Sequence, residues 1–325
     1  MRALHLPEQR GGRIALKKKP EIGRPKLTQE HKTRGILWML ATMLCFITLD
    51  TTMKYTLGFY PLMEANWGRF FFATVFAALI CGRRLPELVK TKLPGWQALR
   101  SLLLAITTGV FNAAIMGVPL PTGTVIMFMT PIIVTMQSSL FLGEHVGWRR
   151  WLGIAVGFSG ALVVAAGSEF SGATSLFSIG LLLIAAVTNA SYQTVTRKLR
   201  EDNPLTTLLY AAALGAVFTS ILLPVSDWVW PDLKGWGLLV LAGLAGCLGH
   251  LCLIRAYSLA PAAVVAPFAY SSLVWATIYG FLIWGDFPTA TTLIGAALII
   301  GSGLYIFLRE STLGVTRADP TPALE

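Results

Sequence analysis

Two neighbouring apolar stretches between Ile36 and Ile80 carry side chains that could do chemistry inside a membrane. Asp50 and Lys54 lie four residues apart in the first stretch, and Arg69 lies in the second. An ionisable side chain at bilayer depth costs roughly 2.5 to 3.5 kcal/mol by insertion scales, so such residues pair, line water or bind a substrate. The hairpin made by these two stretches is therefore the first place to look for function.

Asp50 and Lys54 have two interpretations. Their spacing places them on one helix face, where they can form an ion pair. In the functional interpretation, Asp50 binds a cation or a proton with an affinity that changes as its partner moves. In the structural one, the pair is permanent and Arg69 or Glu64 completes it, while Lys54 could also extend to the membrane surface. Arg69 is either an anchor for these carboxylates or a fork for an anionic group.

Polar and aromatic residues in other apolar stretches could complete a solute site. Hydrocarbon does not tolerate unpaired amide or imidazole groups, so each bonds a solute or a neighbouring helix. An imidazole could also exchange protons near neutral pH, and flat rings could stack on an aromatic or cationic solute. Tyr270 is favoured among the rings, because Pro267 removes a backbone donor three residues earlier. Beside Asp50, Lys54 and Arg69, the candidates are Asn112, Asn189, Tyr192, Gln193, His250, Tyr270 and Trp275.

The composition is typical of an integral membrane protein. Of 325 residues, 54% are hydrophobic and only 13% are charged, with a mean hydropathy of +0.65. This leaves too little polar surface for a soluble protein of this size. The net charge of +10 does not indicate nucleic acid, because ten of the 26 basic residues precede Gly35 and most others lie in short connections between apolar stretches.

Motifs for catalysis or metal binding are absent from the sequence. There is no phosphate-binding loop, no H-E-x-x-H and no G-x-S-x-G in a suitable context. The four cysteines lie in or beside apolar stretches, and the four histidines are scattered. We therefore expect no disulfide framework, no metal, no cofactor and no enzymatic activity.

Ten stretches are long enough to span a membrane, which requires about 20 mostly apolar residues. With ten spans, 23 of the 26 basic residues, Arg100 among them, fall on the side of the N-terminal tail. The exceptions are Lys54 and Lys234 on the other side and Arg69 within a span. Both ends are therefore predicted to be cytoplasmic. The predicted spans are 35–57, 62–81, 97–117, 122–142, 149–167, 176–196, 205–224, 236–257, 262–284 and 288–308.

The two halves of the chain match each other, which indicates either an internal repeat or a chance match of a few small residues. The helix count and the spacing favour the repeat. Two halves of five spans would enter the membrane in opposite senses, and inverted repeats of this kind place a solute site near the middle of the membrane. Glycines at three- to four-residue spacing on the fifth and tenth spans predict close helix packing. The step in sequence from Pro119 to Pro261, which we call the repeat offset, also places Gly143-Glu144 on Gly285-Asp286, Gly153 on Gly295 and Ala155 on Ala297. The predicted parts are a disordered basic tail (1–34), two repeats (35–167 and 176–308) and a C-terminal cytoplasmic tail (309–325).

Two stretches resemble a known family. The segment from Pro131 to Val164, PIIVTMQSSLFLGEHVGWRRWLGIAVGFSGALVV, resembles the end of the EamA domain of the drug/metabolite transporter superfamily. The segment that starts at Arg255, RAYSLAPAAVVAPFAYSSLVWATIYGFLIWGDFP, resembles its second copy. In both copies a glycine and an acidic residue follow the apolar stretch, Gly143-Glu144 and Gly285-Asp286, and we call this pair the Gly-acid corner. The second copy has Asp286 where the family usually has Glu. The resemblance implies an all-α membrane fold of ten helices, an inverted repeat and a central cavity.

The first hairpin resembles a narrower group within that superfamily. Its pattern is Asp50, Lys54, Tyr60-Pro61, Glu64 and Arg69, similar to permeases grouped with those for riboflavin, S-adenosylmethionine and related carboxylates, amino acids or amines. Members of this group carry chemically different solutes on one scaffold, so the resemblance does not name the solute.

These observations predict a permease in the cytoplasmic (inner) membrane of a bacterium. It moves a small organic solute of the vitamin, nucleoside-like, amino acid or amine class by alternating access, driven by the solute gradient or by protons. Import and export both remain open. An intramembrane lipid-modifying enzyme that uses Asp50, Arg69 and His250 is an alternative, and a scaffold without transport is another.

Overall fold

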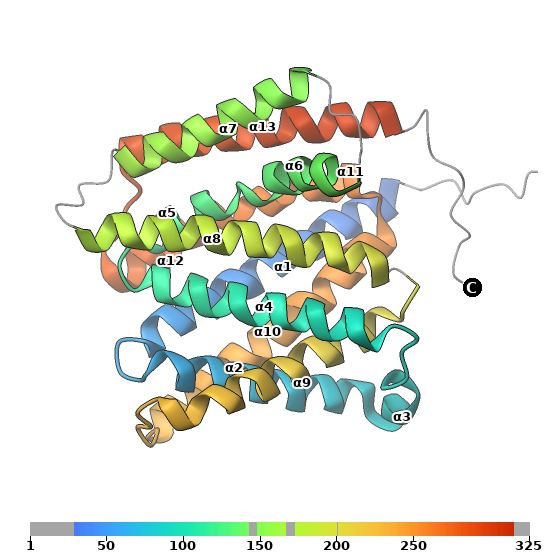
Figure 1. Cartoon of the computed structure of the whole chain (residues 1–325), viewed down its shortest axis with the longest axis vertical. Coiled ribbons are helices and arrows are strands. Elements are labelled where there is room, and N and C mark those ends of the chain that lie inside the picture. The colour runs from blue at the N-terminus through green and yellow to red at the C-terminus, as the bar shows by residue number, and fades with distance from the viewer. Residues whose placement is uncertain (1–28, 143–147, 167–172, 200, 315–325) are drawn as a thin grey trace, which may run out of the picture.

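Helices make up all regular structure in the part of the chain that the computed structural model describes, which is residues 29–142, 148–166, 173–199 and 201–314. Eight helices there are long and apolar enough to cross a membrane, and two shorter apolar helices, Leu120–Val134 and Trp151–Ala166, complete the set. The all-α membrane fold with ten spans is thereby confirmed. Figure 1 shows the helices running side by side, with the start of the first and the end of the last at the same end of the bundle.

Each half of the chain contains five spans and several short helical segments. The first half contains α1 (Gln29–Thr56), α2 (Leu62–Cys81), η1 (Gly82–Arg84), α3 (Leu85–Leu88), α4 (Pro94–Ile115), α5 (Leu120–Met127), α6 (Thr130–Leu142) and α7 (Trp148–Ala166). The second contains α8 (Ala173–Thr196), η2 (Arg197–Leu199), α9 (Pro204–Leu222), η3 (Leu223–Val225), α10 (Leu233–Leu259), α11 (Ala262–Val265), η4 (Ala266–Ser271), α12 (Ser272–Trp284) and α13 (Ala290–Gly314). We call the end that holds the start of α1 and the end of α13 proximal. The distal end holds the connections 57–61, 116–119, 226–232 and 285–289 (Figure 1).

The first and last helices extend beyond the predicted spans. The predicted disordered tail is wrong for residues 29–34, because α1 already begins at Gln29. A salt bridge of 3.8 Å between Arg34 and Glu30 lies on this extension. Backbone hydrogen bonds need no apolar surroundings, so a helix can continue into water once a span has started it. The remaining tail residues, 1–28 and 315–325, lie outside the described residues.

The fourth and ninth spans are broken helices, whereas the sequence predicts them as continuous. The fourth divides into α5 and α6 around Phe128 and Met129. The ninth contains α11, the 3-10 segment η4 and α12. Pro131 and Pro267 each lack a backbone N–H and disturb the helix before them. Broken helices in matching positions of two halves are characteristic of membrane proteins that hold a solute at mid-depth.

Glycine contacts between α7 and α13 follow the repeat. A Cβ added to Gly153 would lie 3.0 Å from Ile306, and one added to Gly295 would lie 2.3 Å from Val164. The repeat offset converts the first pair into the second. The same relation joins the contacts Gly157–Ser302 and Gly160–Ile299. The predicted packing faces are therefore confirmed at these glycines, whereas Gly301 has open space around it.

An aromatic pair marks the axis that relates the two halves. Phe128 and Tyr270 are equivalent residues, separated by the repeat offset, and their rings meet edge to face with centroids 4.9 Å apart. Equivalent residues that touch each other must lie at the two-fold axis. The helix pairs follow the same symmetry, because α1 packs on α10 as α8 packs on α4, and α2 packs on its own counterpart α9. The axis therefore runs through the two broken helices.

Candidate functional site

Asp50 and Arg69 form an opposite-charge pair that does not close into a salt bridge. Asp50 lies on α1 and Arg69 on α2, each about 10 Å from the distal end of its helix at 1.5 Å per residue. Both lie deep in the bundle and attract each other electrostatically. Within the described residues, Asp50 makes no hydrogen bond or salt bridge, yet its side chain is only half-buried. The carboxylate of Asp50 is therefore left unpaired within the described residues, although it lies near the opposite charge of Arg69.

The second half contributes an aromatic hydroxyl and an imidazole to the same region. Tyr192 on α8 interacts electrostatically with Arg69. His250 on α10 lies within electrostatic range of Arg69 and Arg100. Nδ1 of His250 lies 2.9 Å from the carbonyl oxygen of Gly246, and its ring meets Phe46 edge to face. Residues from both halves thus surround one charged region, although His250 already has a backbone partner.

Arg100 is a member of this region that the sequence places elsewhere. The prediction counts it only among the charges on the cytoplasmic side, but its side chain on α4 is buried, with 4% exposed. It donates to the hydroxyls of Tyr192 and Thr196 and to the carbonyl oxygen of Thr207, and it stacks 4.5 Å from the Tyr192 ring centroid. The sequence did contain a sign that Arg100 is buried, because this residue falls three residues inside the predicted span 97–117.

Two of the candidate amides bond neighbouring helices. Asn112 on α4 is buried and donates to Oδ1 of Asn66 on α2 at 2.7 Å. Asn189 on α8 donates to the Thr130 hydroxyl at 3.3 Å. Gln193 lies four residues after Asn189 on α8 and is exposed, so its amide does not join that of Asn189 in the interior. Asn112 and Asn189 join helices, and Gln193 lies outside the charged region.

Two of the aromatic candidates, Tyr270 and Trp275, lie on the broken ninth span. Tyr270 contacts Phe128 on the axis, and its hydroxyl is so close to Gly303 that a Cβ there would lie 2.5 Å away. Trp275 packs against the cluster that contains Leu120, and its buried Nε1 has no hydrogen-bond partner among the described residues. Phe128 is an additional candidate that sequence reasoning missed, although applying the repeat offset to Tyr270 could have identified it.

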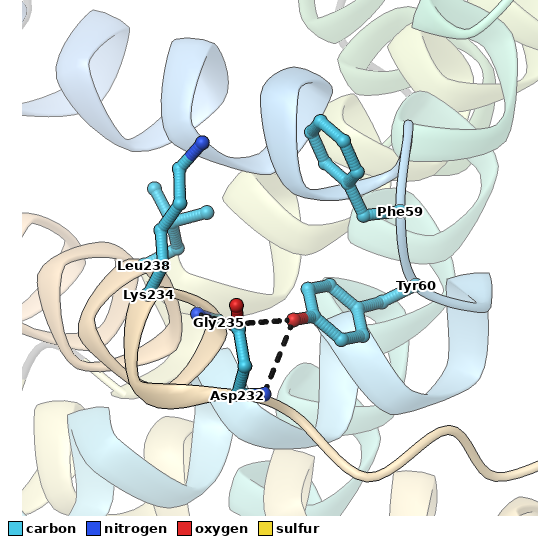
Figure 2. A pocket seen from close by; sticks show the side chains of 6 residues that line it. All are labelled: Phe59, Tyr60, Asp232, Lys234, Gly235 and Leu238. Atoms are coloured by element: carbon cyan, nitrogen blue, oxygen red, sulfur yellow. Dashed lines mark hydrogen bonds between the residues drawn. The ribbon is translucent and has the colours of Figure 1, made fainter.

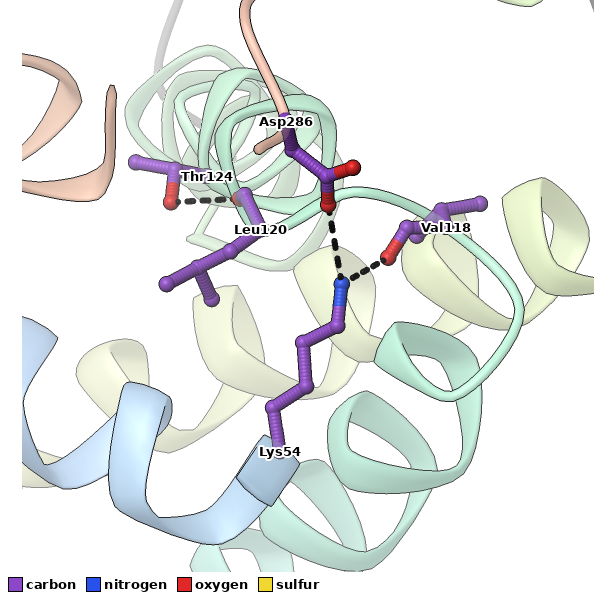
Figure 3. Close-up of polar contacts among 5 residues, drawn as sticks. All are labelled: Lys54, Val118, Leu120, Thr124 and Asp286. Carbon is purple, nitrogen blue, oxygen red and sulfur yellow. Dashed lines mark hydrogen bonds and ion pairs between the residues drawn. The ribbon is translucent and has the colours of Figure 1, made fainter. Parts of the chain in front are cut away.

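Lys54 pairs with a different acid from the one expected. Its Nζ lies 3.7 Å from Oδ2 of Asp286 and donates to the carbonyl oxygen of Val118 at 2.9 Å (Figure 3). No salt bridge joins Lys54 to Asp50 within the described residues, so the expected pair is wrong. Glu64 does not complete it either, because its Oε2 accepts the backbone N–H of Val229. The long side chain of Lys54 can adopt several rotamers. It extends to Asp286 because the connection between α12 and α13 places that carboxylate near its ammonium group.

Comparisons with known proteins agree with this arrangement. A family model described as the EamA-like transporter family matches residues 33–166 and 176–308. The chain belongs to this family. It is thus a multi-pass membrane protein and a transporter, and its two matched segments each contain five spans.

Several curated relatives of this EamA-like transporter are named transporters. The S-adenosylmethionine uptake transporter of Rickettsia bellii is 28% identical over 85% of this chain and 94% of its own length. The riboflavin transporter of Vibrio cholerae is 29% identical over 86% and 94%. The pseudopaline exporter CntI of Pseudomonas aeruginosa is 27% identical over 82% and 93%. A crystal structure with 16% sequence identity superposes with a TM-score of 0.61 over 86% of this chain and 99% of the other, which shows the fold alone.

A small cavity of about 160 Å³ lies at the distal end of the EamA-like bundle, between Phe59, Tyr60, Asp232, Lys234, Gly235 and Leu238 (Figure 2). Asp232 accepts the backbone N–H of Gly235 at 2.7 Å and the Tyr60 hydroxyl at 2.9 Å. These bonds hold the pKa of Asp232 below its usual value. Lys234 donates to the Tyr55 hydroxyl at 2.8 Å. The polar groups of this cavity are thus largely paired with one another.

Metal coordination has no visible support in the described residues. They contain no group of three or more His, Cys, Asp or Glu side chains that could hold an ion. All four cysteines are free thiols.

Proposed function

We propose that this protein is a secondary transporter that carries a small organic solute between Asp50 and Arg69 by alternating access. The uncompensated pair of charges is the observation that carries the proposal. A permanent structural salt bridge would close the gap between the two side chains, because unpaired charge inside a membrane is costly. A solute with a cationic and an anionic group would complete both contacts and leave neither charge unpaired.

Aromatic rings give the proposed site a flat surface. Tyr270 and Phe128 lie on the two-fold axis, where the broken spans meet, and Tyr192 lies near Arg69. Rings of this kind favour planar or cationic groups. The relatives named for S-adenosylmethionine and riboflavin support a vitamin, nucleoside-like, amino acid or amine solute. The exporter among the relatives supports neither direction over the other.

The proposed orientation has both ends of the chain in the cytoplasm of a bacterium, with the distal end facing outward. The charge distribution supports it, since connections at the proximal end carry most Lys and Arg residues. In this proposal, repeats 35–167 and 176–308 move relative to each other between flanking tails 1–34 and 309–325. Asp50 also binds the coupling proton where transport uses one, and no catalytic step is involved.

The purified protein in liposomes tests this proposal. Uptake of radiolabelled S-adenosylmethionine, riboflavin and an amino acid pool is measured with and without a pH gradient. We expect saturable flux of one solute. Product formation in detergent, without two compartments, would instead support the lipid-modifying enzyme.

The Asp50→Asn variant identifies the role of the acid. Because Asp50 has no bond to lose within the described residues, the variant should fold and reach the membrane in near-normal amounts. We expect it to abolish flux or to remove the effect of the pH gradient. Unchanged flux with an unchanged pH response would remove Asp50 from the mechanism.

A further inference from the structure

A single lysine joins the two repeats at the distal end. Nζ of Lys54 donates to the carbonyl oxygen of Val118 and lies 3.7 Å from Oδ2 of Asp286 (Figure 3). It also lies 4.9 Å from the ring centroid of Trp284. Val118 belongs to the α4–α5 connection of the first repeat. Asp286 and Trp284 belong to the second repeat, at the end of α12. The Lys54 side chain is only 12% exposed, so its ammonium group is largely enclosed by these contacts.

The backbone after α12 fixes the position of the carboxylate. Gly285 adopts a left-handed conformation with φ of +73°, which a residue with a side chain rarely adopts. Its N–H donates to Phe281, and the N–H of Asp286 donates to Gly280. These two bonds close the helix and turn the chain, so that Asp286 faces the α4–α5 connection. Gly280 itself packs on Pro121 at the start of α5.

The ammonium of Lys54 is engaged by three groups of the described residues. One hydrogen-bond donor is taken by Val118, the carboxylate of Asp286 attracts the charge, and the Trp284 ring covers a further side. Such a charge-assisted contact is stronger in this enclosed position than at an exposed surface, where ion pairs contribute little. The residue therefore holds protein segments together instead of binding cargo.

We propose that Lys54, the Val118 carbonyl and Asp286 form a latch that keeps the distal mouth of the transporter closed. This inference rests on the transport function proposed above and assigns Lys54 a positioning role. Lys54 lies one helical turn distal to Asp50 on α1, and α1 packs against α12. A solute that enters between these helices from the distal end passes the latch before it reaches Asp50, so the latch must break in the distally open state.

Accessibility of a reporter cysteine tests the latch without any solute. The reporter is Thr51→Cys in a protein whose four native cysteines are replaced by alanine. Thr51 lies between Asp50 and Lys54 on α1 and is 6% exposed. Its buried hydroxyl has no partner in the described part of the chain, so the substitution breaks no hydrogen bond seen there. A membrane-impermeant maleimide is added from the distal side, and the labelling rate is measured.

Two variants break the latch and three serve as controls. We expect Lys54→Met and Asp286→Asn each to raise the labelling rate about tenfold, because loss of the charge contact shifts the population toward the open state. Lys54→Arg keeps the charge and should label at the parental rate. Lys234→Met and Asp227→Asn remove exposed distal charges outside the latch and should also leave the rate unchanged. The double variant Lys54→Met/Asp286→Asn should label no faster than either single variant.

Parental labelling rates in both latch variants, with folding verified by size-exclusion chromatography and thermal melting, would overturn the proposal. Equal acceleration by Lys234→Met would also overturn it, since that result would reflect general loosening of the distal end. If Lys54→Met does not fold, Asp286→Asn decides alone. Because labelling requires no cargo, a failed latch and a failed transport assay give separate results.

Discussion

Asp50 and Lys54 lie one helical turn apart but serve different surroundings. Asp50 is attracted by Arg69 without forming a salt bridge to it in the described part of the chain, while Lys54 is enclosed by connections from both repeats. The types and the spacing of these residues are visible in the sequence. The partner of Lys54 is not, because Asp286 lies in the other repeat, near the opposite end of the chain. Local spacing states which contacts are possible, and only the tertiary arrangement selects among them.

Arg100 provides a prediction about folding. Replacement by methionine leaves the Tyr192 hydroxyl and the Thr207 carbonyl without their charged donor, so we expect a loss of roughly 2 kcal/mol per lost bond at most and a lower melting temperature in detergent. Arg83→Met, at an exposed position of η1, is the matched control and should melt with the wild type. Equal melting of both variants would show that the three contacts of Arg100 do not stabilise the fold.

Hydropathy predicts which segments span the membrane, but it does not predict where the helices end or break. The ten spans follow from apolar length alone. The breaks at Phe128 and in η4 do not, since a proline is compatible with either a kink or a break and neighbouring segments decide between them. Extension of α1 to Gln29 is likewise invisible to hydropathy, because the added turn is polar.

The cap of α10 gives a pH-dependent prediction. Asp232 is the N-cap and accepts the N–H of Gly235, which holds its pKa below the usual value in the folded protein. A carboxylate whose pKa is lowered by folding stabilises the folded protein at pH values above its pKa in the unfolded chain, which is about 4. This stabilisation is lost as the pH falls through its pKa in the folded protein. Asp232→Ala should therefore lower the melting temperature at pH 7 and have little effect near pH 3. Asp227→Ala, in the same connection, should show no such difference.

The glycine seam between α7 and α13 gives a prediction about packing. A Cβ on Gly160 would lie 2.9 Å from the backbone oxygen of Gly295, which cannot move aside as a flexible side chain can. Gly160→Val should destabilise the protein by about 1 to 3 kcal/mol, measured by chemical or thermal unfolding in detergent. Gly301→Ala on α13 meets open space and should be neutral or slightly stabilising. A neutral Gly160→Val would contradict the close approach.

At the scale of the whole molecule, the repeat is what the sequence predicts most completely. One constant offset aligns the Gly-acid corners, and the structure shows it again in the Gly153–Ile306 and Gly295–Val164 contacts. The meeting of Phe128 with Tyr270 required the structure, because an offset alone does not state where an axis passes. The same holds for the charged region, which takes residues from α1, α2, α4, α8 and α10.

The orientation of the whole molecule gives a prediction about access. Asp227 and Glu201 flank α9; Glu201 is exposed at the proximal end, and Asp227 lies in the exposed distal connection. In the protein without native cysteines, Asp227→Cys should react with an impermeant maleimide in intact cells, and Glu201→Cys only in inside-out vesicles. The reverse pattern would invert the proposed orientation. Labelling of both positions from one side would contradict a crossing of the membrane by α9.

The two-fold axis through Phe128 and Tyr270 makes one conformation a template for another. If each half can adopt the shape now held by its counterpart, exchanging the two shapes generates the oppositely open molecule without any new fold. Take any pair of residues, one in each half, and replace each by its equivalent in the other half, one repeat offset forward or back. In the exchanged molecule, this second pair is separated by the distance that the first pair has now. Spin-label distances recorded in a single state therefore contain the expected values for the other.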